Sequence, residues 1–416
     1  MDMFDLSDSE EEEEDISPEE MPLDIRVVLE REMYFVGQDI TGTIIIANPV
    51  KRKMRGIRLT LRCRAEVVWW QTKRGLKKPH KIKHLNDDNL LYTEKYVVGD
   101  GKVMVLQEGK HQFPFSISLK GKKKRQLPSS MEFPKGSARY YLKAELDWPW
   151  ASAQEHERIV SVVDPINLCD VGDALQPATF TKTIKVGSAL ARKKIHIAGR
   201  LEKLGYVPGE EVLLHVEIDN ASSSRISDCK IQLVEVVKYL SSDNHLETTR
   251  NILTTTELGA IAKKCDLVRE KEPLFVPVVA QSAVSAVEFM KITHEVSIVI
   301  QVNGSTKSVS QRIIIGTLPT KNSYKRFNHG TAPSPRVCMW PYSHLTHLPF
   351  PTVTPSPPCP GVDWNYIMCL DPEFQLQNVC YQFDRKKAIE TFDDLSEADS
   401  ADEEGDSQGN LSDFSI

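Results

Sequence analysis

Apolar and polar residues alternate with a period of two through most of the middle of the chain. The segments 57–67, 138–148 and 212–219 show this alternation, with an apolar side chain at every second position. Such alternation gives a strand one face that packs on a core and one face in water, as in antiparallel sheets. Glycine, proline and asparagine separate the runs, and none of the runs has the period of a long amphipathic helix. The pattern therefore predicts an all-β body of sandwich type.

A segment of the first half of the chain recurs in the second half at a constant offset of 172 residues. Tyr34–Ile40 reads YFVGQDI, and Tyr206–Val212 reads YVPGEEV. The shared glycine supplies a turn conformation that residues with a Cβ atom resist. A period of this length is too long for a solenoid and predicts two copies of one sandwich. The same offset carries Ile44, Ile46, Asn48, Ile57, Leu59 and Leu61 onto Val216, Ile218, Asn220, Cys229, Ile231 and Leu233.

Changes in composition divide the chain into five parts. Residues 1–22 form an acidic extension that has too little apolar area to bury, and they are predicted to be disordered. The two sandwiches are expected at 23–165 and 185–319, joined by a connector at 166–184. Beyond them, residues 320–416 are first rich in proline and then rich in Ser, Asp and Glu. This composition predicts a mostly disordered tail.

The formal net charge of −6 conceals two acidic ends and a basic body. Residues 1–20 contain four Asp, seven Glu and no basic residue, which gives −11. Residues 384–416 contain seven Asp and four Glu against two Lys and one Arg, which gives −8 and leaves +13 on residues 21–383. A basic body favours an anionic partner, and the acidic ends become candidates to compete for the same surface.

Basic side chains gather in three loops and along one strand face of the first sandwich. Arginine and lysine at such places suit phosphate groups on a modified protein tail or on a lipid headgroup. The alternative interpretation is that charged loops keep a β-protein soluble and protect its edges. Nucleic acid is not an expected ligand, because no recognition module is visible and exposed aromatic residues do not interleave with the clusters. The candidate anion- or cargo-binding residues are Lys51, Arg52, Lys53, Arg58, Arg62, Arg64, Lys122, Lys123, Lys124 and Arg125.

Four serines lie beside acidic residues, as substrates of an acidophilic kinase do. The candidate phosphorylation sites are Ser7, Ser9, Ser396 and Ser400. Each phosphate would add about −1.5 to −2 charge to an end of the chain that is already acidic. We expect the acidic ends to compete with an anionic ligand for the basic body. The alternative is that they only keep the protein soluble.

Several short segments, in the right order along the chain, resemble the α-arrestins, which are the arrestin-domain-containing proteins. Residues 108–115 (EGKHQFPF) resemble the family's Gly-x-x-x-Phe-Pro-Phe strand, and residues 205–210 (GYVPGE) with 217–222 (EIDNAS) resemble the opening of its C-domain. Further matches are LPSS at 127–130 with GSARYYLKA at 136–144, VVDPINL at 162–168, and IIIGTLP at 313–319.

The resemblance implies an all-β chain of two tandem arrestin-type β-sandwich domains with disordered acidic N- and C-terminal tails. It also implies an adaptor, not an enzyme, that binds cytosolic tails of membrane proteins and links them to endocytic sorting or ubiquitination machinery. The expected localisation is cytoplasmic, with peripheral association with the plasma membrane or endosomes, and anionic lipid is a second candidate partner. The alternative is a stoichiometric arrestin-fold subunit of an endosomal coat or scaffold complex.

One departure from the family concerns ubiquitin ligases. Many α-arrestins recruit these enzymes through Pro-Pro-x-Tyr motifs that bind WW domains. The single Pro-Pro of this chain, Pro357-Pro358, is followed by Cys359 and Pro360, and no Pro-Pro-x-Tyr occurs in the sequence. Direct WW-domain recruitment of a ligase is therefore not expected.

Motifs of catalysis are absent from the sequence. There is no Gly-x-Ser-x-Gly, no phosphate-binding Gly-rich loop and no His-Glu-x-x-His, so no catalytic residue and no cofactor is predicted. The eight cysteines lack paired spacing and are expected to be reduced thiols in the cytosol. No metal ligand is predicted either, although a zinc site in the tail is a less favoured alternative. Its candidate ligands would be Cys338, His344, His347, Cys359, Cys369 and Cys380.

Overall fold

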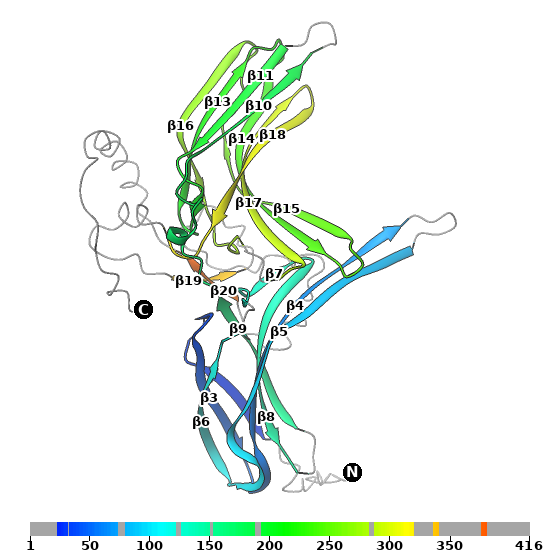
Figure 1. Cartoon of the computed structure of the whole chain (residues 1–416), viewed down its shortest axis with the longest axis vertical. Helices are drawn as coiled ribbons and strands as arrows, with labels where there is room; N and C mark the ends of the chain where they lie inside the picture. Colours follow the sequence, from blue (N-terminus) through cyan, green and yellow to red (C-terminus); the bar gives the residue numbers. More distant parts are fainter. Residues whose placement is uncertain are drawn as a thin grey trace, which may run out of the picture.

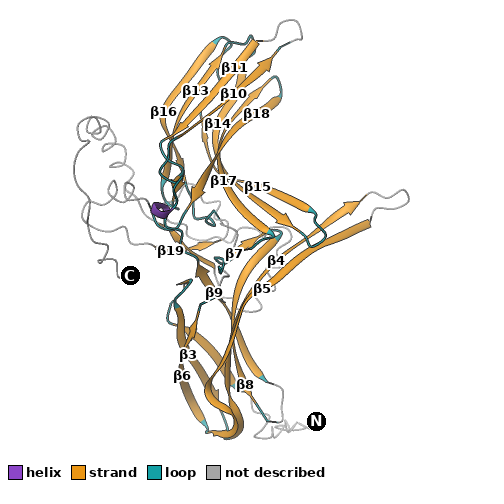
Figure 2. Ribbon diagram, viewed as in Figure 1, coloured by secondary structure: helices purple, strands orange, loops and turns teal. Residues whose placement is uncertain are grey.

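The computed structural model shows a molecule built almost entirely of β-strands (Figure 1). Its only helix within the described part of the chain is the short 3-10 turn η1, Leu168–Asp170 (Figure 2). Among the same residues, no helix has the length and apolar character needed to cross a membrane. The structure describes residues 23–31, 33–73, 80–121, 126–149, 153–187, 193–282 and 287–319, and the backbone of two further strands at 336–340 and 376–380.

The first domain, the N-domain, is a sandwich of two sheets that bury their alternating apolar faces against each other. One sheet has the order β1-β3-β6, and the other has the order β2-β9-β8-β4-β5, with β7 paired to β8. The first sheet contains β1 (Asp24–Leu29), β3 (Asp39–Asn48) and β6 (Gly109–Ser118). The second contains β2 (Met33–Phe35), β4 (Arg52–Lys73), β5 (His80–Leu106), β7 (Met131–Phe133), β8 (Gly136–Asp147) and β9 (Gln154–Val163).

The second domain, the C-domain, repeats this strand order. Its sheets run β10-β11-β13-β16 and β12-β18-β17-β14-β15, so they match the N-domain sheets strand for strand except for β10, which the N-domain lacks, and β7, which has no C-domain counterpart. This architecture confirms the prediction of an all-β chain with two tandem sandwiches. The first sheet contains β10 (Ala178–Val186), β11 (Lys193–Leu201), β13 (Glu211–Asn220) and β16 (Cys265–Phe275). The second contains β12 (Gly205–Tyr206), β14 (Ile226–Leu240), β15 (Leu246–Glu257), β17 (Met290–Val302) and β18 (Ser305–Ile315).

Residues related by the offset of 172 have the same structural role in both domains. Gly37 and Gly209 have φ values of 94° and 95°, which is the left-handed region that glycine adopts without strain. Asn48 and Asn220 are buried at the ends of β3 and β13, where their side-chain amides donate to loop carbonyls. The repeat therefore extends from the sequence to turn geometry and buried hydrogen bonds.

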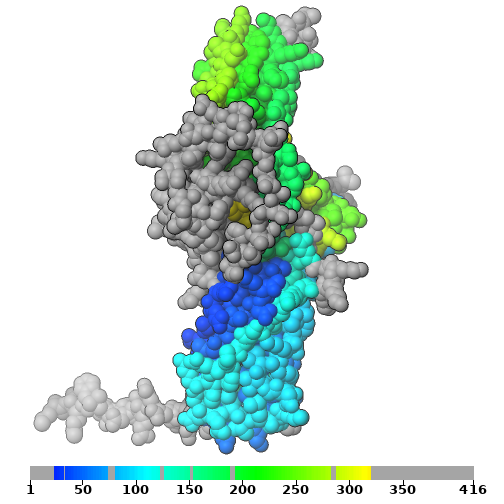
Figure 3. Space-filling view, turned by 60° about the vertical axis from the view of Figure 1, so that its left-hand side comes forward, coloured from blue at the N-terminus to red at the C-terminus, as the bar shows by residue number. Residues whose placement is uncertain are grey.

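The two sandwiches stand end to end (Figures 1 and 3). They also share apolar packing. The N-domain core cluster includes C-domain side chains, among them Tyr239 near the end of β14, Met290 at the start of β17 and Phe289 just before it. The rest of the C-domain has a core cluster of its own. Because apolar side chains of one domain are buried with those of the other, separating the domains would expose this area to water.

The β4–β5 hairpin is longer than the sandwich to which it belongs. Its strands have 22 and 27 residues, and its distal part extends past the N-domain toward the turn between β14 and β15 (Figure 1). There Ser242 of the β14–β15 turn donates from both its amide and its hydroxyl to the carbonyl oxygen of Leu85, at 3.0 and 2.8 Å. Asn86 Nδ2 donates to the carbonyl oxygen of Leu240 at 3.2 Å. The hairpin thus forms a second contact between the domains.

The segment expected to be a connector is largely held by the C-domain. Residues 178–184 belong to β10, which pairs along its whole length with β11 and buries Phe180 and Ile184. Their alternation has period two, which is a strand signal that the connector interpretation overlooked. The Ile166 carbonyl accepts hydrogen bonds from the amides of Thr317 and Leu318, after β18.

Most of the predicted tails lie outside the described residues. This holds for the acidic extension at 1–22 and for residues 320–416, apart from two strands. These strands are β19 (Arg336–Trp340) and β20 (Leu376–Cys380), which pair antiparallel. In the backbone register Cys338 pairs with Asn378, and β20 lies beside β9. The predicted tail therefore contains a two-stranded antiparallel pair that composition did not indicate.

Candidate interaction surface

The outer face of β4 carries a row of arginines. The inward positions Ile57, Leu59 and Leu61 are fully buried, so the alternation places Arg58 and Arg62 on the opposite side of the sheet. Neighbouring β8 and β9 present acidic side chains on the same side. The row is thus built by the strand pattern itself, as the sequence predicts.

Each arginine that the sequence singled out on this face contacts carboxylates. The Arg58 guanidinium donates to Glu145, which occupies the paired position on β8. This hydrogen bond raises the pKa of Arg58. Arg62 donates to both carboxylate oxygens of Glu157, at 3.1 and 2.8 Å, and its guanidinium lies 4.6 Å from the ring centre of Tyr141. Glu145 and Glu157 therefore neutralise the charges of Arg58 and Arg62 within the sheet.

Arg64, the third of the predicted arginines, has a weaker set of partners. Its guanidinium lies 3.5 Å from Glu66 and 3.3 Å from Asp87, and all three side chains are substantially exposed. Ion pairs in such positions contribute little to stability because water and salt screen them. Of the three arginines, Arg64 is therefore the one whose partners an external anion would displace most easily.

Asp147 at the end of β8 is the centre of a further polar group. Arg55 donates to its Oδ1 through Nε and Nη2 at 3.0 and 2.6 Å, and Tyr96 donates to its Oδ2 at 2.9 Å. Burial raises the pKa of Asp147, but the hydrogen bonds from Arg55 and Tyr96 outweigh it and hold the pKa below its usual range. Tyr96 belongs to β5, so this group joins three strands of the sheet.

A buried ion pair lies beside Arg64 on the same face of the sheet, where Arg139 pairs in register with Arg64. Arg139 on β8 donates from Nε and Nη2 to the two oxygens of Glu132 on β7, at 2.7 and 2.6 Å. Burial raises the pKa of Glu132, and the guanidinium opposes this effect. The fork geometry and burial identify a structural pair that fixes β7 against β8.

The structure does not bring the basic loops of the N-domain together. The register of β3 with β6 pairs Asp39 with Ser118 and Asn48 with Gly109, so Lys51–Lys53 follow one end of this ten-residue strand pair. Lys120 follows the opposite end, about 30 Å away at 3.3 Å per residue. Residues 122–125 lie outside the described residues, as do Ser7, Ser9, Ser396 and Ser400. Anion binding by these basic residues stays a prediction.

Sequence analysis did not anticipate the exposed apolar side chains on the β4–β5 hairpin and on β15. Trp70 and Tyr92 of the β4–β5 hairpin are 61% and 58% exposed, and Leu246 at the start of β15 is 63% exposed. Both β5 and β15 end their sheets, so each has a free backbone edge in the described structure. An edge strand with exposed apolar side chains can accept an added strand from a partner. The adjacent Trp69 and Trp70 interrupt the alternation of apolar and polar residues. This interruption was the sequence signal for an exposed apolar side chain.

A buried Ser-His-Glu group in the C-domain bears on catalysis. Ser282 Oγ lies 3.0 Å from His294 Nδ1, and His294 Nε2 lies 3.8 Å from Glu235. Ser282 Oγ also accepts a hydrogen bond from the backbone amide of Ile315 at 2.9 Å, and Glu235 Oε1 accepts one from Asn251 Nδ2 at 3.0 Å. Because these bonds tie loops and strands together and His294 is fully buried, the group has a structural explanation.

The paired sandwiches with one strand order, joined end to end, define the arrestin fold. The comparisons agree with this class. The model of the arrestin (or S-antigen) N-terminal domain matches residues 23–169, and that of the C-terminal domain matches residues 191–320. This chain belongs to the arrestin-domain-containing, or α-arrestin, family.

Several curated relatives show the extent of the similarity. Arrestin domain-containing protein 17 of Caenorhabditis elegans is 26% identical over 326 residues, covering 73% of this chain and 74% of that protein. Arrestin domain-containing protein 4 of Homo sapiens is 24% identical over 301 residues, with 69% and 68% covered, and that of Mus musculus is 25% identical over 294 residues, with 69% of each covered. Proteins of this family are typically non-enzymatic adaptors and generally bind membrane-protein cargo.

Proposed function

We propose that this protein is an adaptor that binds cytosolic parts of membrane proteins and links them to endocytic sorting or ubiquitination machinery. It acts in the cytoplasm and associates peripherally with the plasma membrane or endosomes. Binding, not catalysis, is its activity. The observation that supports this proposal is the pair of arrestin domains held together by shared apolar packing, which presents exposed strand edges from both domains on one body.

Two surfaces of the N-domain suit such cargo. The edge of β5 offers backbone groups and exposed aromatic side chains to an extended peptide. Lys51 and Lys53 are exposed at the distal end of the sandwich, where they can contact acidic or phosphorylated segments and anionic headgroups. A ligase would be reached through another protein, because the chain has no Pro-Pro-x-Tyr.

Proximity labelling in living cells tests the adaptor proposal. The full chain is fused to a biotin ligase, and labelled proteins are compared with those labelled by the ligase alone. We expect integral membrane proteins of the plasma membrane and endosomes to be enriched. Enrichment of soluble proteins only would contradict the proposal. A fixed-stoichiometry complex that stays intact on size-exclusion chromatography would instead favour a constitutive coat or scaffold subunit.

A charge-reversal variant tests the basic end of the N-domain. Lys51→Glu with Lys53→Glu is compared with Lys193→Glu and Lys194→Glu, which changes two exposed lysines of the C-domain. We expect the first variant to lose labelled membrane proteins and the second to retain them. Equal labelling by both variants would remove this end of the N-domain from the cargo surface and leave the adaptor role itself intact.

A further inference from the structure

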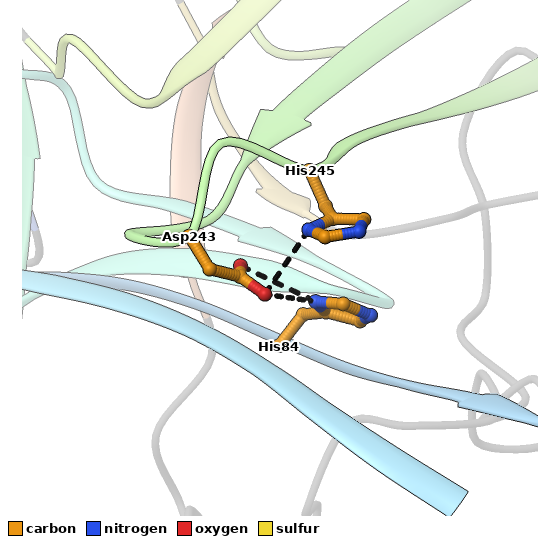
Figure 4. Close-up of side chains that lie close together, drawn as sticks. All are labelled: His84, Asp243 and His245. Carbon is orange, nitrogen blue, oxygen red and sulfur yellow. Dashed lines mark hydrogen bonds and ion pairs between the residues drawn. The ribbon is translucent and has the colours of Figure 1, made fainter.

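Two histidines and an aspartate from different domains meet where the β4–β5 hairpin contacts the C-domain. His84 lies on β5, whereas Asp243 and His245 lie in the β14–β15 turn (Figure 4). Asp243 Oδ2 is 3.1 Å from His84 Nδ1 and 3.0 Å from His245 Nδ1. Both ring nitrogens therefore point at one carboxylate from opposite sides of the domain boundary, and one potential ligand atom from each residue lies within 4.8 Å of the other two.

The ring of His84 is held on both sides. His84 is 1% exposed, and its Nε2 lies 3.3 Å from Oε1 of Gln71 on β4. Its Nδ1 faces both carboxylate oxygens of Asp243, at 3.1 and 3.3 Å. The buried imidazole of the N-domain is therefore aimed at a carboxylate of the C-domain.

The second imidazole approaches the same carboxylate oxygen. The ring of His245 lies over that of His84 with centroids 4.4 Å apart, and both Nδ1 atoms lie close to Asp243 Oδ2. Imidazole nitrogens and a carboxylate oxygen are ligands that divalent transition metals accept. One such ion placed between the three groups would be bound by all of them.

The distances and the surrounding groups match those of a transition-metal site. Ligand atoms of a tetrahedral zinc ion with bonds of about 2.0–2.1 Å lie about 3.3 Å apart, close to the observed separations from Asp243. Gln71 holds His84 from behind, Ser241 donates to Asp243, and Trp69 stacks on the His84 ring at 5.2 Å. Outer groups of this kind fix the orientation of metal ligands.

We propose that His84, Asp243 and His245 bind one divalent transition-metal ion, with Zn²⁺ as the best-fitting ion, and that the ion clamps the two arrestin domains together. Two imidazoles and a carboxylate favour Zn²⁺ over Ca²⁺ or Mg²⁺, which prefer oxygen ligands alone. Three protein ligands leave a fourth position for water or for a ligand from a partner. Because one ligand comes from the N-domain and two from the C-domain, the ion fixes the position of the hairpin on the turn.

Zinc stoichiometry of the full chain, purified without a histidine tag, tests the proposal. The protein is stripped with a chelator, dialysed against Zn²⁺ and analysed by elemental mass spectrometry. Because the chain contains other Cys and His, the quantity to measure is the difference from the variant Asp243→Asn with His245→Ala. Both changes lie on an exposed turn, and circular dichroism verifies folding. His80→Ala, an exposed histidine on the same β5 strand, is the matched control.

We expect the wild type and His80→Ala to bind one equivalent of Zn²⁺ more than the double variant. Co²⁺ should give visible absorption of tetrahedral type in the first two proteins, and that absorption should be lost in the third. Gln71→Ala should weaken binding by about 10- to 100-fold, because it removes an outer partner of His84. Equal stoichiometry in all these proteins would overturn the proposal and leave a hydrogen-bonded clamp without a metal.

Discussion

Tyr34 and Tyr206 occupy equivalent places at the start of the two domains. Tyr34 on β2 pairs in parallel with Val162 of β9, and Tyr206 on β12 pairs in parallel with Ile315 of β18. Both rings are buried, and each hydroxyl donates to a nearby backbone carbonyl, at 2.7 and 3.0 Å. The predicted repeat is thereby confirmed at the level of single side chains, and it makes paired experiments in the two domains meaningful.

The buried asparagines of the repeat should contribute unequally to stability. Asn48 Nδ2 donates to Gln107 and Leu106 carbonyls, whereas Asn220 donates to two carbonyls and also accepts the amide and hydroxyl of Ser222. Each change to Ala leaves buried groups without partners, which costs about 1–3 kcal/mol. We expect Asn220→Ala to be at the upper end and Asn48→Ala at the lower end in urea unfolding. The opposite order would contradict this account.

Removing one member of the Glu132–Arg139 pair should be far more harmful than removing both. Glu132→Leu leaves a buried guanidinium without its carboxylate, which should cost about 3–5 kcal/mol of unfolding free energy. Glu132→Leu with Arg139→Met replaces both charges by apolar groups of similar volume and should restore most of that loss. Chemical denaturation of the single and double variants measures the coupling. Additive losses would show that the two side chains do not act as a pair.

Stability should fall in acid partly through Asp147. Its pKa in the folded protein is lowered from 3.8, so its interactions with Arg55 and Tyr96 contribute fully above that pH. The contribution is lost as the pH falls through the folded pKa, because the carboxylate then becomes protonated. Asp147→Asn should lower stability at pH 7 and flatten the decline below about pH 4. Parallel stability curves for the variant and the wild type would rule this explanation out.

The apolar contact between domains should couple their unfolding. Phe289 is a C-domain residue whose side chain is buried in the N-domain core cluster. Phe289→Ala should cost about 3–5 kcal/mol and separate one thermal transition into two. Ile300→Ala, within the C-domain core cluster, should lower stability without separating the transitions. Calorimetry distinguishes the two outcomes, and a single transition in both variants would show that this contact does not join the domains.

The acidic ends are expected to compete with anionic ligands for the basic body. Deleting residues 1–20 and 384–416 should increase binding to a phosphopeptide at low salt, because it removes charges of −11 and −8. The gain should shrink at high salt, where the Debye length is shorter. Fluorescence anisotropy at two salt concentrations measures the effect. Unchanged affinity at low salt would leave the ends with a role in solubility alone.

The fold followed from the sequence because its determinants are local. Two local signals act within a few residues: the alternation at Ile57, Leu59 and Leu61, and the turn glycines Gly37 and Gly209. Because the signals recur at an offset of 172, they also indicate two copies of one domain. Residues 178–184 of the expected connector form most of β10, whose buried positions Phe180 and Ile184 alternate with polar residues.

The candidate sites followed less completely because they depend on distant pairs. The arginines of β4 were identified, but their carboxylate partners on β8 and β9 could be assigned only once the strand order was known. His84 and Asp243 are 159 residues apart and meet only because the β4–β5 hairpin outgrows its sandwich. No local pattern in the sequence predicts how long the hairpin is or that it contacts the β14–β15 turn.

The shared apolar packing also sets the order in which the chain becomes stable during synthesis. Phe289, Met290 and Ile292 fill the N-domain core cluster, yet they are made well over a hundred residues after the last N-domain strand. An emerging N-domain therefore exposes the apolar surface that these side chains will cover. Such a surface on a nascent β-protein invites chaperone binding or aggregation until residue 292 has left the ribosome. The core of the N-domain is thus completed only when the C-domain side chains pack against it. A fragment that ends near residue 165 would leave this apolar surface exposed to water.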